Sequence, residues 1–161
     1  MDDCARWLID HLPPESGRAS VVHGDFKLDN VMLALDRIDR VVAVFDWEMT
    51  ALGDPLIDVG ILLAYWSSQI AGGDPKSVEP LTAREGWFSR DQIVERYARQ
   101  SGRDVSRMRF YEIFALFKIG VVIQQIFYRY KQGQTDDPRF EGFDRRVTGL
   151  ARRAVALRDR P

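Results

Sequence analysis

The most informative segment of the sequence is His23-Gly24-Asp25-Phe26-Lys27-Leu28-Asp29-Asn30. It is followed by an apolar run at residues 31–35, and a second apolar run, residues 41–45, ends at Asp46. The polar segment between the two runs is typical of a turn that joins two strands. Because antiparallel strands meet head to tail, such a hairpin places Asn30 and Asp46 at the same end. We therefore predict a cluster of two oxygen ligands, Asn30 and Asp46, beside the carboxylate of Asp25.

This set of side chains suits phosphoryl transfer. Hard cations such as Mg²⁺ take oxygen ligands, often one or two carboxylates together with substrate phosphates. A separate carboxylate can orient an attacking hydroxyl and accept its proton. In protein kinases the catalytic-loop Asp is followed five residues later by a metal-binding Asn, and Asp25 and Asn30 have this spacing. The alternative is a strand-capping aspartate among ordinary turn residues, which would match the spacing by chance.

Three motifs follow one another within residues 21–60: His23-Gly24-Asp25 with Asn30, Asp46-Trp47-Glu48, and Gly53-Asp54-Pro55 with Asp58. In this order they resemble the aminoglycoside phosphotransferase family of small-molecule kinases, and most of all its members that are similar to the kinase-like domain found beside acyl-CoA dehydrogenases. The resemblance implies that Asp25 is the catalytic base and that Asn30 and Asp46 hold Mg²⁺ and thereby the co-substrate ATP. It also implies that Asp58 supports the catalytic loop from the following helix.

Two further residues of the motif region are assigned from their positions. His23 is expected to hold the loop around Asp25 by bonding its backbone rather than to act as the base. Lys27 could neutralise charge on the transferring phosphoryl group and is a catalytic candidate; the alternative is a solvated loop lysine. Asp58 lies in an otherwise apolar helical segment, and a buried carboxylate needs partners. The backbone N–H groups of residues 23–25 are the natural candidates.

A protein kinase also needs a Gly-rich loop and a strand-borne lysine that clamp the nucleotide phosphates, and nothing before Val21 supplies either. We therefore expect residues 1–161 to form a single domain, the C-terminal lobe of a protein-kinase-like fold with the nucleotide-binding N-terminal lobe absent. Such a chain should be inactive or weakly active alone. The alternative function is a non-catalytic remnant that binds a metabolite or another protein.

The expected fold class is α+β, mostly helical, with short β-hairpins around the catalytic loop. Apolar residues spaced as on one helical face, and the capping residues at the ends, predict five helices. These are residues 2–12 with an inner face of Cys4, Trp7, Leu8, His11 and Leu12; residues 56–65; residues 90–100, opened by a Ser89/Gln92 capping box; residues 105–132, capped by Asp104; and residues 139–158, with arginines on a solvated face. Residues 71–80 read as a loop.

Composition places the chain among ordinary globular proteins. It has 161 residues, 45% hydrophobic and 29% charged, and Cys4 is its one cysteine, which excludes a disulfide framework and favours a reducing, cytoplasmic compartment. The longest apolar region, residues 110–128, contains Glu112 and Lys118. Because charges are costly inside a bilayer, we predict a buried core helix here and no membrane association.

Charge is distributed unevenly along the chain. Residues 1–83 carry 6 Lys/Arg and 14 Asp/Glu, whereas residues 84–161 carry 17 and 10. The acidic half contains the predicted cation site. The basic half would form the substrate-binding helices, and a basic surface disfavours a polycationic amine. We therefore expect a neutral or anionic small-molecule substrate. No nucleic-acid partner is expected, because the arginines alternate with acids and the isoelectric point is near 6.1.

Overall fold

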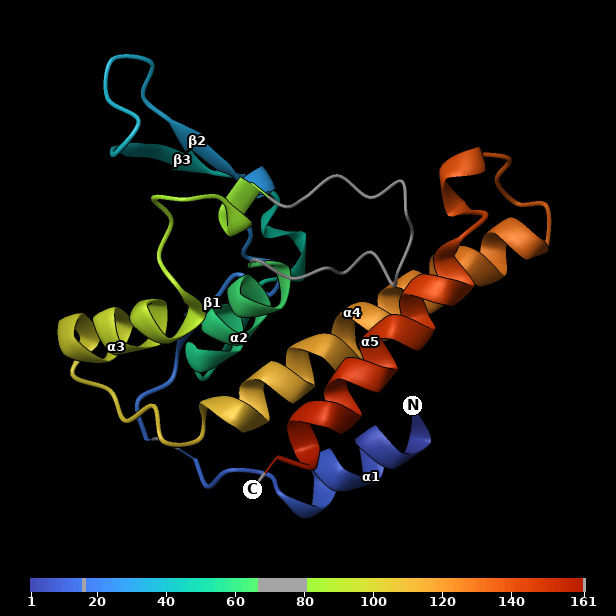
Figure 1. Cartoon of the computed structure of the whole chain (residues 1–161), viewed down its shortest axis with the longest axis horizontal. Helices are drawn as coiled ribbons and strands as arrows, with labels where there is room; N and C mark the ends of the chain where they lie inside the picture. The colour runs from blue at the N-terminus through green and yellow to red at the C-terminus, as the bar shows by residue number, and fades with distance from the viewer. Residues whose placement is uncertain (16, 67–80, 161) are drawn as a thin grey trace.

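The computed structural model of the chain describes residues 1–15, 17–66 and 81–160 and has helices on one side and two small antiparallel sheets on the other (Figure 1). The α-helices and strands are α1 Asp2–Asp10, β1 Ser20–Val22, β2 Val31–Leu33, β3 Val41–Val44, β4 Ala51–Gly53, α2 Leu56–Tyr65, α3 Arg90–Ser101, α4 Met108–Lys131 and α5 Phe143–Arg158. Short 3-10 turns span Leu28–Asn30, Trp47–Met49, Leu81–Ala83 and Pro138–Phe140. The predicted loop at residues 71–80 lies outside the described residues.

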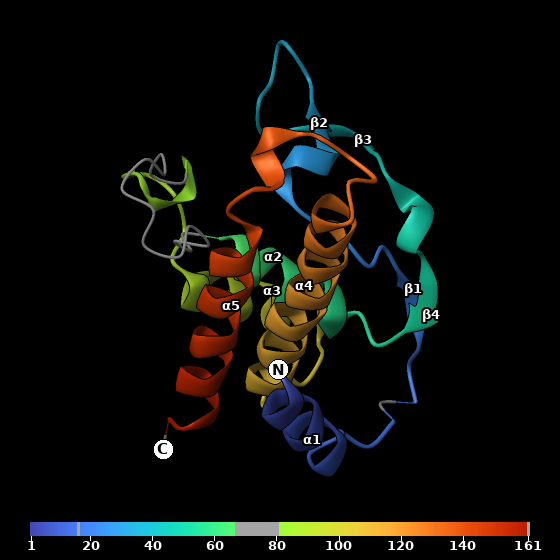
Figure 2. The same cartoon turned by 90° about the vertical axis from the view of Figure 1, so that its right-hand side faces the viewer.

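Each sheet contains two strands. In the β2–β3 hairpin Val31 lies opposite Val44 and Met32 opposite Ala43, with a register shift after Met32. The second sheet joins β1 to β4 with antiparallel register, a pairing that the sequence did not indicate. Figure 2 shows the hairpin projecting away from the helices while β1 and β4 run along their side. The loop that connects β1 to β2 therefore lies between the two sheets and the helical layer.

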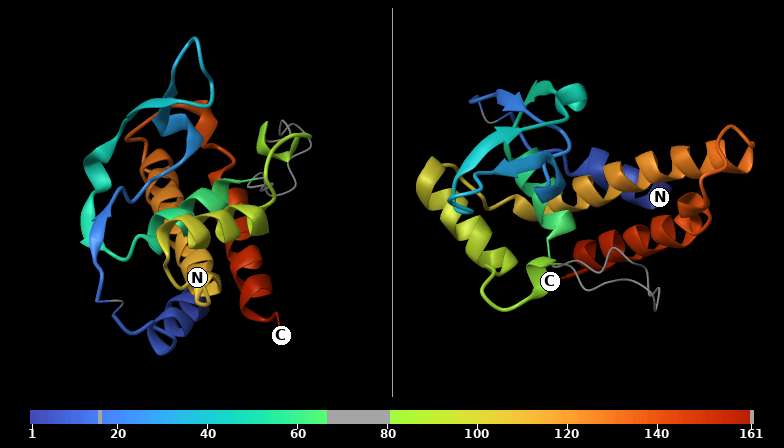
Figure 3. Two further views of the ribbon diagram at one scale, coloured as in Figure 1. Left: turned by 90° about the vertical axis from the view of Figure 1, so that its left-hand side faces the viewer. Right: turned by 90° about the horizontal axis from the view of Figure 1, so that it is seen from above.

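Helix α4 forms the centre of the helical layer. Helices α2 and α5 pack along it and α1 contacts both α4 and α5; Figure 3 shows α4 and α5 running side by side. The largest fully buried side chains come from these helices and are Ile61, Leu63, Ile113, Leu116 and Leu150. Burial of each such side chain stabilises the fold by about 1.5–3 kcal/mol. By length and hydropathy alone α4 could cross a membrane, but these contacts make it the core helix that the sequence predicted.

Helices α2 and α4 approach each other closely at Gly60. A Cβ atom at this position would lie 2.5 Å from the backbone oxygen of Tyr111, which is closer than carbon and oxygen can approach. The absence of a side chain at Gly60 therefore allows the two helix backbones to touch. This contact fixes the position of α2, which begins directly after β4 and carries Asp58.

The C-terminal end of α2 is held by two arginines from other helices. Arg90 donates to the backbone oxygen of Leu63 and to the carboxylate of Glu112. Arg153 of α5 donates to the backbone oxygen of Ala64 over 3.2 Å. Burial and the nearby Arg90 lower the pKa of Arg153 to about 10. The expectation that the arginines of the last helix are solvated is therefore wrong for Arg153, because its guanidinium binds a helix end that carries partial negative charge.

Several predicted helix ends are shifted for local reasons. Helix α4 begins at Met108 rather than at residue 105, since the Asp104 carboxylate accepts hydrogen bonds from the backbone and hydroxyl of Ser106 and forms a separate turn. Helix α5 begins at Phe143 because a 3-10 turn precedes it. Helix α1 ends at Asp10, so His11 and Leu12 are exposed rather than part of an inner face. The capping box of α3 is confirmed.

Candidate active site

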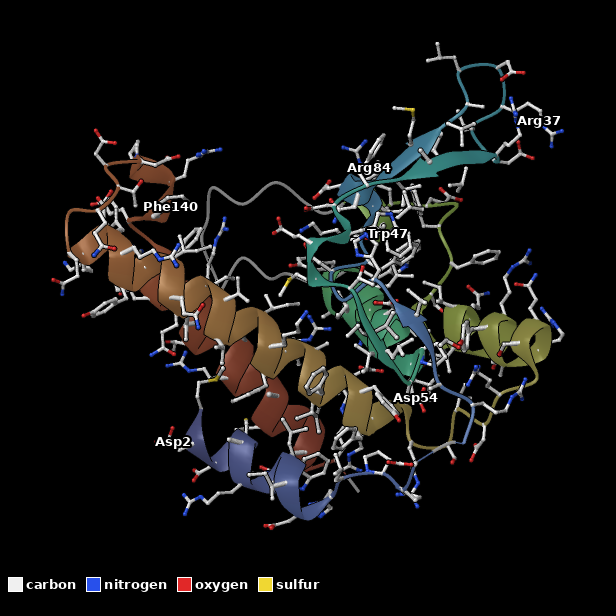
Figure 4. All side chains as sticks on the ribbon, turned by 180° about the vertical axis from the view of Figure 1, so that it is seen from behind. Asp2, Arg37, Trp47, Asp54, Arg84 and Phe140 are labelled. Carbon is white, nitrogen blue, oxygen red and sulfur yellow. The ribbon has the colours of Figure 1, made fainter. Side chains whose placement is uncertain are left out.

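The predicted oxygen ligands lie at one end of the β2–β3 hairpin. Asn30 immediately precedes β2, and its backbone oxygen accepts a hydrogen bond from the backbone N–H of Phe45 over 2.8 Å. Asp46 is the next residue after Phe45. The register therefore places Asn30 and Asp46 at the same end of the hairpin, as the sequence predicted. Trp47 lies at the base of the hairpin, between it and the helices (Figure 4).

Asp58 of α2 binds the backbone of residues 23–25, the predicted catalytic loop. Its two carboxylate oxygens accept hydrogen bonds from the backbone N–H groups of His23, over 2.7 Å, and of Gly24, over 2.8 Å. These are the partners that the sequence predicted for a carboxylate in an apolar helix. The carboxylate thus satisfies two partly buried N–H groups and connects the loop to the core helix α2.

His23 is buried, and both of its ring nitrogens have partners. Nε2 lies 2.6 Å from the backbone oxygen of Phe45, so this nitrogen must donate. Nδ1 accepts from the backbone N–H of Asp25 over 3.2 Å. These contacts select the neutral tautomer with the proton on Nε2. His23 therefore connects the loop to the end of β3, and neither nitrogen is available as a base or a metal ligand.

The conformation of Gly24 requires glycine. Its φ angle is +82°, a left-handed value that disfavours residues with a side chain. A Cβ atom here would lie 2.4 Å from the backbone oxygen of Met49. The loop can therefore make its turn into Asp25, and remain in contact with the 3-10 turn that follows Asp46, only because no side chain is present at this position.

Asp25 is paired with Lys27. The lysine Nζ lies 2.5 Å from Asp25 Oδ2, and both side chains are 22% exposed. The same Nζ lies 5.4 Å from the centroid of the Tyr65 ring. Burial, together with the charges of Asp25 and Asp29, raises the pKa of Tyr65 to about 12. Lys27 thus contacts the predicted base and an aromatic ring. The alternative interpretation, a solvated loop lysine, does not describe this arrangement.

Asn30 and Asp46 have the features expected of cation ligands. The buried Asn30 donates through Nδ2 to the backbone oxygen of Asp25 over 2.9 Å, and within the described residues its amide oxygen accepts no hydrogen bond. Asp46 has φ +65°, and in the described part of the chain no other residue except glycine has a positive φ. Such backbone strain is concentrated at functional sites. An amide oxygen and an exposed carboxylate, on residues at the same end of the hairpin, are hard donors of the kind that Mg²⁺ takes.

Lys118 is a site residue that the sequence reasoning missed. It lies on α4, and its Nζ donates to the backbone oxygen of Gly24. Burial lowers the pKa of Lys118, while the charges of Asp25 and Asp58 act in the opposite direction. The signal was available in the sequence, because a charge within the apolar region 110–128 needs a partner just as Asp58 does.

Comparison with known proteins identifies the family. A model described as "Phosphotransferase enzyme family" matches residues 1–111. The chain belongs to this family. The predicted resemblance is thereby confirmed, and the predicted catalytic loop, Asp46 and Asp58 all lie within the matched part of this phosphotransferase-family chain.

Individual relatives agree with the assignment. Acyl-CoA dehydrogenase family member 11 of Gallus gallus is 27% identical over 164 residues, which cover 99% of the chain and 21% of the relative. The protein of the same name from Mus musculus is 31% identical over 83% of the chain and 17% of the relative. Viomycin phosphotransferase of Streptomyces vinaceus is 29% identical over 52% of the chain and 32% of the relative.

A crystal structure of a candidate aminoglycoside phosphotransferase from Ralstonia eutropha matches with a TM-score of 0.81 and 30% identity. The matched region covers 97% of the chain and 47% of the solved protein. The α+β, mostly helical fold class is thereby confirmed. The phosphotransferase-family chain thus spans about half of this solved protein and about a fifth of the dehydrogenase relatives.

Proposed function

We propose that the chain carries the catalytic residues of an ATP-dependent phosphotransferase that moves the γ-phosphate to a hydroxyl group of a small molecule. The observation that supports this most directly is the position of Asn30 and Asp46 at one end of the hairpin, next to the loop that carries Asp25. Family membership supports phosphotransferase chemistry in general. The assignment of the base, the cation ligands and the acceptor rests on the geometry.

Asp25 is the proposed base. Its Oδ2 is held by Lys27, and within the described residues its Oδ1 accepts no hydrogen bond. Oδ1 can therefore accept the hydrogen bond of a substrate hydroxyl and orient it for attack. Lys27 keeps the Asp25 carboxylate in one orientation, and it places positive charge near the position where the transferring phosphoryl group develops negative charge.

Asn30 and Asp46 would hold Mg²⁺, with Asn30 contributing its amide oxygen and Asp46 its carboxylate. The cation would neutralise charge on the β- and γ-phosphates of ATP. Asn30 has a second task, since its amide nitrogen binds the backbone oxygen of Asp25. One side chain thus links the cation position to the proposed base.

The surface beyond the loop favours a neutral or anionic substrate. A depression of about 410 Å³ on the C-terminal half of α4 is lined by Val121, Gln124, Gln125, Tyr128, Arg129 and Gln134. Gln125 follows Lys118 by two helical turns, so it lies on the same face of α4, about 10 Å along the axis from the contact with the catalytic loop. The described lining contains amides, a phenol and one guanidinium but no carboxylate, which disfavours a polycationic amine.

A non-catalytic binding module is the second candidate. The turn of the β2–β3 hairpin and strand β4 carry large apolar side chains at the surface, among them Leu35, Ile38 and Leu52, which are 105%, 81% and 80% exposed. Apolar surface of this kind often marks a contact with another protein. A metal-dependent hydrolase that uses His23 as a ligand is disfavoured, because both ring nitrogens of His23 are already bonded.

Calorimetric titration with Mg·ATP separates the two candidates. We expect saturable binding that Asp46→Asn weakens at least tenfold, while the matched variant Asp39→Asn, on the exposed turn of the hairpin, leaves it unchanged. In a polypeptide that also contains a nucleotide-binding lobe, Asp25→Asn should retain nucleotide binding but lower phosphate transfer to a hydroxylated acid, an acceptor of the neutral or anionic class, by a factor on the order of 100 or more. Absence of Mg·ATP binding, or equal binding by Asp46→Asn, would favour the non-catalytic module. Efficient phosphorylation of kanamycin-like amines with hydroxy acids ignored would contradict the substrate class.

A further inference from the structure

Lys118 connects the central helix α4 to the catalytic loop. Its ammonium group donates to the backbone oxygen of Gly24 and lies 3.7 Å from the sulfur of Met49. The side chain is half-buried. The contact joins residues 94 positions apart in the chain.

The peptide group between Gly24 and Asp25 is held at both of its polar atoms. Its oxygen accepts the hydrogen bond from Lys118, and its N–H, which belongs to Asp25, donates to His23 Nδ1 over 3.2 Å. The preceding peptide N–H, that of Gly24, is bound by Asp58. Because the peptide unit is planar, these contacts set the direction in which the Asp25 side chain leaves the backbone.

The charge of Lys118 is held at a cost to the fold. Burial lowers the pKa of its ammonium group, and only the charges of Asp25 and Asp58 oppose this effect. An apolar residue of similar size would avoid the cost of burying an ammonium group, but it would leave the Gly24 oxygen without this donor. A charged donor of this length at position 118 therefore acts on the Gly24–Asp25 peptide in particular.

We propose that Lys118 is a positioning residue, which acts from α4 on the Gly24–Asp25 peptide so that the Asp25 carboxylate faces the substrate hydroxyl. The catalytic part of this inference rests on the proposed role of Asp25. The same helix carries the depression lined by Gln125 and Arg129. Lys118 thus fixes the distance between the surface that would bind the substrate and the group that would deprotonate it.

Amide hydrogen exchange tests the positioning without any assay of activity. In Lys118→Met we expect the Asp25 and Gly24 amides to exchange about tenfold faster, the effect of losing one hydrogen bond from a charged donor, while amides far from this loop exchange at an unchanged rate. Lys131→Met is the matched control, since Lys131 lies on the same helix and contacts the Phe127 ring rather than the loop. Lys118→Arg, which retains a charged donor, should restore slow exchange in part.

Kinetics then test the consequence for catalysis. In a polypeptide that also contains a nucleotide-binding lobe, Lys118→Met should lower kcat about tenfold or more and leave the KM of the hydroxyl substrate within about twofold, because the substrate surface is intact. The proposal is overturned if the loop amides of Lys118→Met exchange no faster than those of Lys131→Met. It is also overturned if all amides of Lys118→Met exchange faster by the same factor, because a uniform increase indicates a role in stability. If the methionine variant fails to fold, the arginine variant and Lys118→Gln are compared by the same exchange measurement. Faster loop exchange would still support the positioning if the polypeptide with both lobes transferred no phosphate, and the missing transfer would then contradict only the proposed function.

Discussion

Replacement of Asp58 by asparagine should weaken the whole fold and loosen the catalytic loop in particular. In the native protein the two carboxylate oxygens accept the backbone N–H groups of His23 and Gly24 over 2.7 and 2.8 Å. An asparagine has nearly the same shape but offers one acceptor and one NH₂ group. One backbone N–H would then face another donor, and the remaining backbone N–H would bind a neutral amide oxygen instead of a charged carboxylate oxygen.

The magnitude follows from these two hydrogen bonds. A hydrogen bond to a charged group contributes about 1.5–3 kcal/mol, and an unsatisfied buried donor costs a similar amount. Loss of one bond and weakening of the other therefore lower the free energy of unfolding by about 3 kcal/mol. With a urea m-value of about 2 kcal/mol per molar, the midpoint of unfolding falls by about 1.5 M. Asp58→Ala, which removes both acceptors, should lower it at least as far.

Urea unfolding followed by tryptophan fluorescence and circular dichroism measures this shift. The control is Asp144→Asn, because Asp144 is exposed in the first turn of α5, a helix that does not carry residues 23–25. Hydrogen exchange should show the largest local change at the amides of His23 and Gly24. A midpoint within 0.3 M of the control, or unchanged exchange at these two amides, would refute the assigned role of Asp58.

Three further predictions concern the loop, the core and alkaline pH. Gly24→Ala should lower the free energy of unfolding by at least about 2 kcal/mol in urea titration, since its Cβ would lie 2.4 Å from the Met49 oxygen; an unchanged midpoint would contradict the close contact. Leu63→Ala should lower the free energy of unfolding by about 3 kcal/mol in thermal unfolding, because Leu63 is 0% exposed. A decrease below 1 kcal/mol would show that neighbouring side chains close the cavity left by the truncation. Burial and the Asp54 charge raise the pKa of Tyr111 to about 12. The contribution of this group to the free energy of unfolding is therefore fully present below pH 10 and is lost between pH 10 and 12. Tyr111→Phe should remove part of this loss, and parallel profiles of stability against pH for the two proteins would exclude it.

The parts of the site that the sequence predicted depend on local patterns or on a buried charge. Two apolar runs around a polar turn define the β2–β3 hairpin, and its register places Asn30 beside Phe45 and hence near Asp46. The pairing of β1 with β4 was missed because Ala51-Leu52-Gly53 has neither alternation nor β-branched residues. The catalytic and cation-binding roles of these residues stay predictions that the proposed experiments test.

The contrast between Asp58 and Lys118 shows why only one of two buried charges could be placed from the sequence. A carboxylate needs donors, and unpaired backbone N–H groups are concentrated in irregular loops such as residues 23–25, so few partners were available for Asp58. An ammonium group needs an acceptor, and every residue offers a backbone oxygen, often with a spare lone pair. The partner of Lys118 was therefore determined by how α4 packs across the loop, with Gly24 94 residues away, and only the folded structure contains that information.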